Sequence, residues 1–353
     1  MNIIKAKNIV KKIYFIRSNK NKFGGAEVYL SRLSIALHKN NIDHKIVNSI
    51  FPNFLPSWLR VILFNLQLFL FKGKRFYFSL DRIVCPDIYR AGDGVHKVFL
   101  KVEKKSIFNP LHPIYLFLER RCFNNAKCII VNSILIKNQI IETYGINPSK
   151  IKLVRNGIEI KKINSNKSYQ KLSKEFSLTP NQQYILYVGS GFKRKGVEEF
   201  LEIISKLDSR NIKVFIIGKD KRINDFKLLS SNLGLQDKVV FTGPREDVDD
   251  FYAISDIFLF PTHYEPFSNV VLEAMSFKNV IYTTKQNGAS EILGNEFIMK
   301  NPKDFSIVDR IDKLLKNTKK LNEIQLKNRI ESKKFSIDKN LVNTLKVINE
   351  VIN

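Results

Sequence analysis

The sequence predicts an α/β protein made of two tandem domains, each built on a parallel sheet. Short runs of β-branched and aromatic residues alternate with stretches of helical period along nearly the whole chain, which is typical of βαβ units. The alternation stops at a polar stretch over 161–183 and then starts again. A length of 353 residues also suits two domains, because most domains contain roughly 100–200 residues.

Each half of the chain has its own series of expected strands. In the first half, strands are expected over 12–17, 44–49, 76–80, 128–132 and 151–154. In the second half, they are expected over 184–189, 212–218, 238–242, 256–260 and 279–283. Ligands of open parallel sheets bind where the strands end at their carboxyl side, so we expect the site there, in a central cleft that the two sheets face.

The domain boundaries follow from composition. Residues 161–183 are rich in Lys, Ser, Asn and Gln and show little apolar periodicity, so we interpret them as a linker between domains over 1–160 and 184–335. From Asp304 onward a helical pattern predicts two or three terminal helices rather than a third domain. The last helix is expected over 336–353, and we leave open whether it returns to the first domain.

The charge of the chain favours an anionic partner. Lys and Arg number 59 against 33 Asp and Glu, which gives a formal net charge of +26. Residues 1–160 hold 27 of these cations and only 9 of the carboxylates. Nucleic acid, an acidic membrane surface and a phosphorylated small molecule all fit such a chain. A hydrophobic fraction of 44% excludes the intrinsically disordered class.

Cysteines and apolar runs indicate the compartment. Cys85, Cys122 and Cys128 form no CxxC pair, which argues against a disulfide framework or a zinc site. The first residues show no long apolar region followed by a cleavage site, so we expect a cytoplasmic protein. The longest apolar run, 58–71, is shorter than the roughly 20 residues that a membrane-spanning helix needs.

Two glycine-rich turns precede expected helices. Gly24 and Gly25 follow the first strand, where a helix N-terminus favours an anion or a polarised oxygen, although a tight turn without a ligand explains them equally well. The second turn, 189–196 (GSGFKRKG), places three cations between glycines before the helix that starts near Val197. A diphosphate suits this turn, and a solvated basic loop is the alternative.

The segment 260–275 (FPTHYEPFSNVVLEAM) carries two carboxylates at different depths. Its Pro and Ser predict a helix that begins near 267–269, with Glu265 in the preceding loop and Glu273 inside the helix. Loop amides over 266–269 could hold a sugar or phosphate, and the two carboxylates could accept hydrogen bonds from hydroxyl groups. Glu273 lies among apolar neighbours, which is an unusual position for a purely structural charge.

Taken together, these motifs resemble family 4 glycosyltransferases of the GT-B fold, which has two Rossmann-like domains. The resemblance rests on the N-terminal GGAE, PDIYRAGDGVH over 86–96, the GSGFKRKGV turn and EPFSNVVLEAM, and it runs from roughly residue 12 to 350. Such enzymes transfer a sugar from a nucleotide-diphosphate donor with retention of configuration. The match is strongest to members that extend the lipopolysaccharide core. It implies an acceptor-binding domain over 1–160 and a donor-binding domain over 184–335.

The resemblance also implies roles for individual residues. Arg194 and Lys195 match the pair that grips the donor diphosphate, Glu273 the carboxylate that holds the ribose, and Glu265 the carboxylate that faces the donor sugar. Asp93 matches an active-site aspartate. The expected catalytic residues are therefore Asp93 and Glu265. The expected donor-binding residues are Gly25, Arg194, Lys195, Glu265, Pro266, Phe267, Ser268, Asn269 and Glu273. The expected acceptor-binding residues are Gly24, Glu27 and His96.

The expected reaction moves a hexose from UDP-glucose or a similar donor to lipopolysaccharide core or another lipid-linked glycan. GDP-mannose or UDP-N-acetylhexosamine with another cell-surface polysaccharide is the alternative. We expect no cofactor and no metal, because the cations of the turn can replace one, and because Asp247 and Asp249 open a helix where acids complement the dipole.

A membrane partner is expected as well. Cations interleave with aromatic and leucine residues over 97–123, which suits peripheral attachment to the anionic inner face of the plasma membrane, although a buried crossover helix is the rival interpretation. A nucleic-acid-binding protein is a remote alternative. The sequence shows no helix-turn-helix, zinc-finger or RNP pattern, so nucleic acid is not an expected partner.

Overall fold

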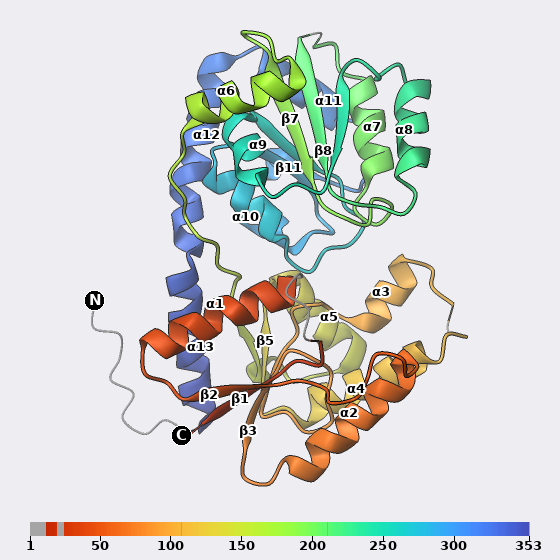
Figure 1. The fold of residues 1–353 in the computed structure, drawn as a ribbon, viewed down its shortest axis with the longest axis vertical. Coiled ribbons are helices and arrows are strands. Elements are labelled where there is room, and N and C mark those ends of the chain that lie inside the picture. The colour runs from red at the N-terminus through yellow and green to blue at the C-terminus, as the bar shows by residue number, and fades with distance from the viewer. Residues whose placement is uncertain (1–11, 20–24, 107, 210, 353) are drawn as a thin grey trace. The chain divides into compact units, whose positions relative to one another are not determined.

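The structure is a computed structural model that describes residues 12–19, 25–106, 108–209 and 211–352 (Figure 1). The chain divides into two compact units. Unit 1 contains residues 1–157 and 337–353, and unit 2 contains residues 158–336. Among the described helices, none is long and apolar enough to cross a membrane.

Unit 1 is built on a parallel sheet of six strands with helices packed against it. The strands are β1 (Ile13–Ile16), β2 (His44–Val47), β3 (Phe76–Ser79), β4 (Ile88–Arg90), β5 (Cys128–Val131) and β6 (Ile151–Leu153). Their spatial order is β2-β1-β3-β4-β5-β6. The helices are α1 (Gly25–Lys39), α2 (Ser57–Phe71), α3 (His96–Val102), α4 (Leu111–Asn125), α5 (Ile134–Tyr144) and α13 (Ile337–Ile352), with a 3-10 turn η1 (Pro148–Lys150).

Unit 2 repeats this architecture with a second six-stranded parallel sheet. The strands are β7 (Gln183–Val188), β8 (Ile212–Ile217), β9 (Val239–Gly243), β10 (Ile257–Phe260), β11 (Val280–Thr284) and β12 (Ile298–Met299). Their spatial order is β12-β11-β10-β7-β8-β9. The helices are α6 (Ser165–Phe176), α7 (Val197–Ser205), α8 (Ile223–Asn232), α9 (Val248–Ile254), α10 (Asn269–Ser276), α11 (Ile307–Leu315) and α12 (Thr318–Ser332). The 3-10 turns are η2 (Gly288–Ile292), η3 (Asn295–Phe297) and η4 (Lys333–Phe335). The predicted α/β class with two parallel sheets is confirmed.

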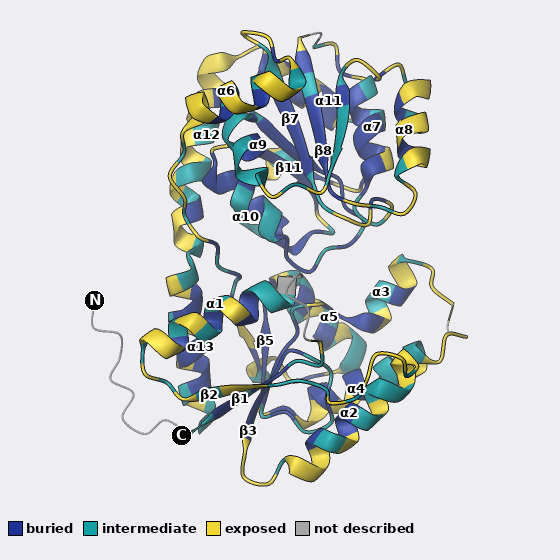
Figure 2. Ribbon diagram, viewed as in Figure 1, coloured by how far each residue is buried: buried dark blue, intermediate teal, exposed yellow. Residues whose placement is uncertain are grey.

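The core of each unit explains why these segments become strands. The central strands are buried on both faces, as expected where helices cover a parallel sheet (Figure 2). Strand β5, for example, reads CIIV, and each of its four residues is buried. The continuous apolar runs of the sequence are therefore the inner strands. Short polar runs such as HKIV of β2 lie at the sheet edge.

The last helix packs into unit 1. Leu341, Leu345 and Ile348 of α13 join a buried cluster that also contains Leu33 and Leu37 of α1. The side chain of Asn340 donates a hydrogen bond of 2.6 Å to the backbone oxygen of Arg155. The open question about the terminal helix is therefore answered by its packing.

The interpretation of residues 161–183 as a linker is wrong. Most of this segment forms α6, which belongs to unit 2. Its apolar residues are few but correctly spaced, since Tyr169, Leu172 and Phe176 follow one another at intervals of three and four residues, and Leu172 is fully buried. The long polar side chains of the exposed face hid this stripe in the sequence.

Candidate active site

The basic turn over 189–196 is fixed by glycines and by a buried aromatic anchor. It joins β7 to α7, and Gly191 and Gly196 both have φ of +78°, a conformation that suits glycine. A Cβ atom on Gly196 would lie 1.9 Å from the backbone oxygen of Pro261. Phe192 is fully buried, and its backbone N–H donates to Asp220 Oδ2 over 2.7 Å. The turn therefore has a defined shape at the N-terminus of α7.

Two of the three cations of this turn meet a carboxylate from a distant segment. Arg194 Nη1 donates to the backbone oxygen of Tyr264 over 2.6 Å and to Glu265 Oε2 over 3.0 Å. Lys195 Nζ lies 3.7 Å from the same carboxylate oxygen. The side chains of Arg194, Lys195 and Glu265 are 27%, 17% and 18% exposed, whereas Lys193 is exposed. We call Arg194, Lys195 and Glu265 the basic cluster, which has a formal charge of +1.

The loop that carries Glu265 is tied to the turn through its backbone. His263 N–H donates to the backbone oxygen of Arg194 over 3.0 Å. Glu265 N–H donates to the oxygen of Gln286, and its own oxygen accepts from Gly288 N–H over 2.9 Å. Both backbone polar groups of Glu265 are therefore hydrogen-bonded, which fixes the point from which its side chain extends.

The same loop is braced by a buried carboxylate of α7. His263 Nε2 lies 2.8 Å from Glu199 Oε1. Burial raises the pKa of Glu199, but the hydrogen bonds of the carboxylate with His263 and with a backbone N–H, together with the charges of His263 and Lys303, leave that pKa below its usual value. A charged Glu199 thus holds His263, which lies two residues before Glu265.

Helix α10 presents Glu273 at its second turn. The helix begins at Asn269 after the cap residue Ser268, as predicted. Glu273 is half-buried, and Tyr252 O–H lies 3.5 Å from Glu273 Oε2. Phe267 is only 5% exposed and belongs to the core of unit 2, so its side chain anchors the loop. Pro266 is buried, and Asn269 is half-buried at the helix N-terminus.

In unit 1 the predicted catalytic aspartate lies in the loop between β4 and α3. Asp93 is exposed, and the neighbouring Gly94 has φ of +75°. Burial lowers the pKa of Arg17, but Asp81, Glu27 and Asp93 together hold it above its usual value. The Asp93 carboxylate therefore lies within electrostatic range of that guanidinium.

The loop that carries Asp93 is held by an ion pair whose carboxylate is fully buried. Glu119 of α4 has no exposed side-chain surface and accepts from Arg82 Nε over 2.8 Å. It also accepts from His96 N–H over 2.7 Å and from Tyr144 O–H over 2.7 Å. Arg82 Nη2 donates to the backbone oxygen of Gly94 over 3.0 Å. Since a buried charge needs several partners, this network fixes the position of the loop. Neither Arg82 nor Glu119 was singled out from the sequence.

His96 lies in the interior of unit 1. It is 8% exposed, its Nε2 lies 3.2 Å from His112 Nδ1, and its ring packs against Phe99 and Tyr115. Burial, helped by Arg82, lowers its pKa to about 4, so the ring is neutral at pH 7. The His96 side chain therefore has a structural role in the core of unit 1, and its predicted role in binding the acceptor substrate stays a prediction.

The predicted residues around the first glycine-rich turn have different outcomes. Gly24 lies outside the described residues, and Gly25 is the first residue of α1. Glu27 accepts from Arg17 Nε over 3.0 Å and from Nη2 over 2.7 Å. Arg17 in turn donates to Asp81 Oδ1 over 2.6 Å. Glu27 is therefore part of an ion-pair network at the end of β1.

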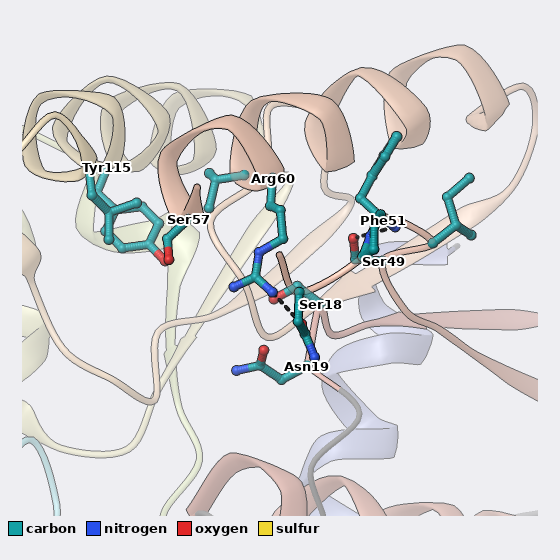
Figure 3. A pocket seen from close by; sticks show the side chains of 12 residues that line it. Ser18, Asn19, Ser49, Phe51, Ser57, Arg60 and Tyr115 are labelled. Atoms are coloured by element: carbon teal, nitrogen blue, oxygen red, sulfur yellow. Dashed lines mark hydrogen bonds between the residues drawn. The ribbon is translucent and has the colours of Figure 1, made fainter. Parts of the chain in front are cut away.

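A pocket of about 650 Å³ opens in unit 1 where β1 and β2 end (Figure 3). It is lined by Ser18, Asn19, Ser49, Ile50, Phe51, Pro52, Asn53, Ser57, Arg60, Val61, Leu111 and Tyr115. Figure 3 shows Arg60 reaching from α2 toward Ser18 and Asn19. Arg60 also donates to the side chain of Asn53. Hydroxyls, amides and two aromatic rings beside one cation suit a carbohydrate that carries a negative charge. In the sequence, the one feature that indicates this pocket is that polar residues directly follow two of the expected strands.

The acidic residues near α9 are engaged by cations. Asp247 binds Arg245 over 2.8 Å and Lys171 over 2.6 Å, and Asp249 pairs with Lys161. Across the described part of the chain, we find no group of three or more His, Cys, Asp or Glu residues that could hold a metal ion. Asp247 occupies the N-cap position of α9, in agreement with the expected helix start.

Comparisons with known proteins agree with the fold. Residues 168–331 match the family model of glycosyl transferases group 1, and residues 93–162 match that of glycosyltransferase family 4. The capsular polysaccharide biosynthesis glycosyltransferase CapM of Staphylococcus aureus is 29% identical over 60% of this chain and 57% of its own length. The lipopolysaccharide glucosyltransferase WaaG of Escherichia coli K12 is 26% identical over 59% of this chain and 58% of its own. The chain thus spans a little over half the length of these two relatives.

Solved structures extend the likeness to the whole chain. A crystal structure of WaaG superposes with a TM-score of 0.79 at 18% identity and covers 95% of this chain and 99% of its own. Anabaena HepE in complex with UDP and glucose superposes with a TM-score of 0.75 at 17% identity, covering 96% and 99%. At these identities the structural likeness concerns the fold.

Proposed function

Because this chain is related to the glycosyltransferases of GT-B fold, we propose that it transfers a hexose from a nucleotide-diphosphate sugar to a saccharide acceptor, with retention of configuration. The observation that carries the proposal is the basic cluster. It places two half-buried cations beside a helix N-terminus and beside a carboxylate, in the unit that matches the group 1 model. UDP complexes of the structural neighbour HepE support a nucleotide donor.

The proposed chemistry follows from the charge that develops during transfer. As the bond between sugar and diphosphate breaks, negative charge grows on the leaving phosphate and the sugar becomes oxocarbenium-like. Arg194 and Lys195 stabilise the phosphate, and the N-terminus of α7 adds its dipole. Glu265 and Glu273 accept hydrogen bonds from sugar and ribose hydroxyls, respectively. Fixed cations in these positions make a divalent metal unnecessary, so we propose a metal-independent reaction.

Unit 1 supplies the acceptor side in this proposal. Asp93 is the proposed catalytic carboxylate, and the network around Glu119 holds its loop. The pocket beside Arg60 has the size and lining for an anionic sugar of the acceptor. A lipopolysaccharide core or another lipid-linked glycan fits this description. The enzyme would then work on the inner face of the plasma membrane.

A second candidate keeps the reaction but changes both substrates. CapM belongs to capsular polysaccharide biosynthesis, and a further relative, 26% identical, is a Campylobacter jejuni enzyme that acts on a diphospho-undecaprenol acceptor. These relatives support another cell-surface polysaccharide as the product, and the N-acetylgalactosamine that the Campylobacter enzyme transfers supports a UDP-N-acetylhexosamine donor. GDP-mannose is the other donor of this second candidate. The nucleotide base and the transferred sugar of the donor therefore have to be tested together.

Thermal shift and transfer assays test the proposal. A ligand that binds only the native protein raises the melting temperature, so UDP, GDP, UDP-glucose, UDP-N-acetylglucosamine and GDP-mannose are compared at equal concentration. Donors that stabilise the protein are then used radiolabelled with truncated lipid A-core acceptors, and NMR of the product gives its anomeric configuration. Activity should persist in EDTA. Failure of every nucleotide to stabilise the protein, or an inverted product, would contradict the proposal.

A further inference from the structure

Helix α2 carries an apolar face that the rest of the described chain leaves exposed. Trp58, Ile62, Leu66, Phe69 and Leu70 are exposed by 38%, 42%, 51%, 63% and 69%. Their spacing of three to four residues places them on one side of the helix. Phe71 is 60% exposed at the helix end, and Phe54 is 84% exposed before its start. We call Trp58, Ile62, Leu66, Phe69 and Leu70 the α2 face.

The opposite side of α2 holds the helix firmly on the sheet. Phe64 and Leu68 are buried in a cluster with Ile16 and Tyr77. Asn65 is also buried, and its Oδ1 accepts from the N–H of Val84 over 3.0 Å. The orientation of α2 is therefore fixed by its buried side. A surface helix normally presents polar residues to solvent, so the exposed apolar side of α2 indicates an interaction surface.

The charge around α2 identifies the partner as an anionic surface. The sequence contains no Asp or Glu between Asp43 and Asp81, and this stretch includes Lys45, Arg60, Lys72, Lys74 and Arg75. Of these, Lys72 is paired with Asp87 outside the stretch. Lys45, Lys74 and Arg75 are exposed. Apolar side chains bordered by cations, without acidic residues, are the composition of helices that lie in the interface of anionic bilayers. A second copy of this chain would bring the same cations against each other.

We infer that the α2 face rests on an anionic lipid bilayer, with Trp58 and the other apolar side chains inserted among the acyl chains. Ser57, Arg60 and Val61 of the same helix line the pocket, so this contact would bring the pocket close to the lipid headgroups. The inference rests on the proposed function in one respect, because the lipid-linked acceptor of that function is the reason for the protein to bind a membrane. It assigns membrane contact to α2 instead of to residues 97–123, where the exposed large apolar side chains among the described residues are Val102, Phe108 and Phe117.

Vesicle cosedimentation tests the inference on the full chain without a substrate. Vesicles of phosphatidylcholine alone and of phosphatidylcholine with phosphatidylglycerol are compared. The wild type should bind the anionic vesicles at least about tenfold more tightly than the neutral ones. The triple variant Ile62→Ser, Leu66→Ser, Leu70→Ser should lose about tenfold or more of this binding, since three inserted side chains are removed. Its melting temperature should stay within about 2 °C of the wild type, because the changed side chains are exposed.

Two matched variants make the outcome specific. Leu228→Ser, Leu326→Ser, Ile330→Ser removes three exposed side chains from unit 2 and should bind vesicles like the wild type. Phe108→Ser, Phe117→Ser should bind nearly as well. The inference is overturned if this double variant loses binding while the α2 variant keeps it. It is also overturned if light scattering shows a dimer that the α2 variant dissociates and vesicles do not bind. Turnover with a water-soluble acceptor reports on the proposed function separately.

Discussion

Arg194→Ala is the substitution that most directly tests the donor side. Arg194 is held by Glu265 Oε2 at 3.0 Å and by the oxygen of Tyr264 at 2.6 Å, so its guanidinium is oriented before any ligand arrives. Removing one preorganised hydrogen-bond donor that faces developing negative charge costs roughly 2.7–4 kcal/mol of transition-state stabilisation. At about 1.36 kcal/mol per tenfold, kcat should fall by about 10² to 10³.

Lys193→Ala is the matched control for this prediction. Lys193 is the neighbouring residue and is exposed, so both variants change the net charge by the same amount. Long-range attraction of an anionic donor is then weakened equally in both proteins. Lys193→Ala should change kcat less than about threefold, since surface charges away from the reacting atoms contribute little.

Steady-state transfer of radiolabelled sugar at saturating donor measures both variants, and thermal denaturation checks that they fold. Loss of the partly exposed pair with Glu265 should cost Arg194→Ala only about 1 kcal/mol of stability. If the two variants lose activity equally, the diffuse positive charge of the turn, rather than a positioned guanidinium, stabilises the transition state. A kcat for Arg194→Ala within threefold of the wild type would refute the assignment altogether.

Five further substitutions, one of them a control, test separate parts of the structure. Glu273→Gln should raise the KM for the sugar donor about 10- to 100-fold with a smaller effect on kcat, because a hydrogen bond from a ribose hydroxyl to a charged acceptor is worth roughly 1.5–3 kcal/mol. Kinetics at varied donor concentration measure this. Asp93→Ala should abolish turnover and leave nucleotide binding, measured by calorimetry, unchanged. Gly196→Ala should lower the free energy of unfolding by more than about 2 kcal/mol, since a Cβ would lie 1.9 Å from the Pro261 oxygen, whereas Gly234→Ala, at φ +70° in open space, should cost only about 1 kcal/mol; urea denaturation compares them. The pKa of His96 is about 4 in the folded protein, against an ordinary value of 6.5, so the unfolded chain takes up the proton first and the free energy of unfolding falls as pH drops between these values. His96→Gln should remove about 3 kcal/mol of that loss, and urea titrations at pH 7 and pH 4 measure it.

Most of the sheet could be predicted because long apolar runs separated by amphipathic stretches are compatible with few arrangements besides alternating strands and helices. Strands β4 and β12 were missed because runs of three and two residues are too short to show a pattern of their own. Strand β6 also has three residues, but Val154 extends its apolar run in the sequence. Helix α6 was missed for a different reason, since its stripe consists of three residues among many Lys, Ser and Asn. Short elements and sparse stripes obtain their stability from tertiary packing, and a single sequence does not display that packing.

The site was predicted in its residue types more completely than in its contacts. The turn 189–196 and Glu265 were both identified, but no local pattern shows that Arg194 and Glu265, 71 positions apart, share a hydrogen bond. Such a contact depends on the order of β7 and β10 in the sheet. The pocket beside Arg60 was missed because its polar lining comes from loops after two strands and from two helices. Each contribution alone has the composition of an ordinary loop.

The pairing of Glu265 with Arg194 affects how the proposed donor would be recognised. A carboxylate 3.0 Å from the guanidinium reduces the positive charge that a diphosphate meets, which weakens the grip on a free nucleotide. The backbone of Glu265 is held by Gln286 and Gly288, so the carboxylate has little freedom to follow the cation. A donor that carries a sugar offers Glu265 the sugar hydroxyls as alternative partners, whereas a nucleoside diphosphate has only its ribose hydroxyls, which the proposal assigns to Glu273. On the proposed function, the cluster would therefore favour the intact donor over the spent nucleotide, because the intact donor compensates both members of the ion pair.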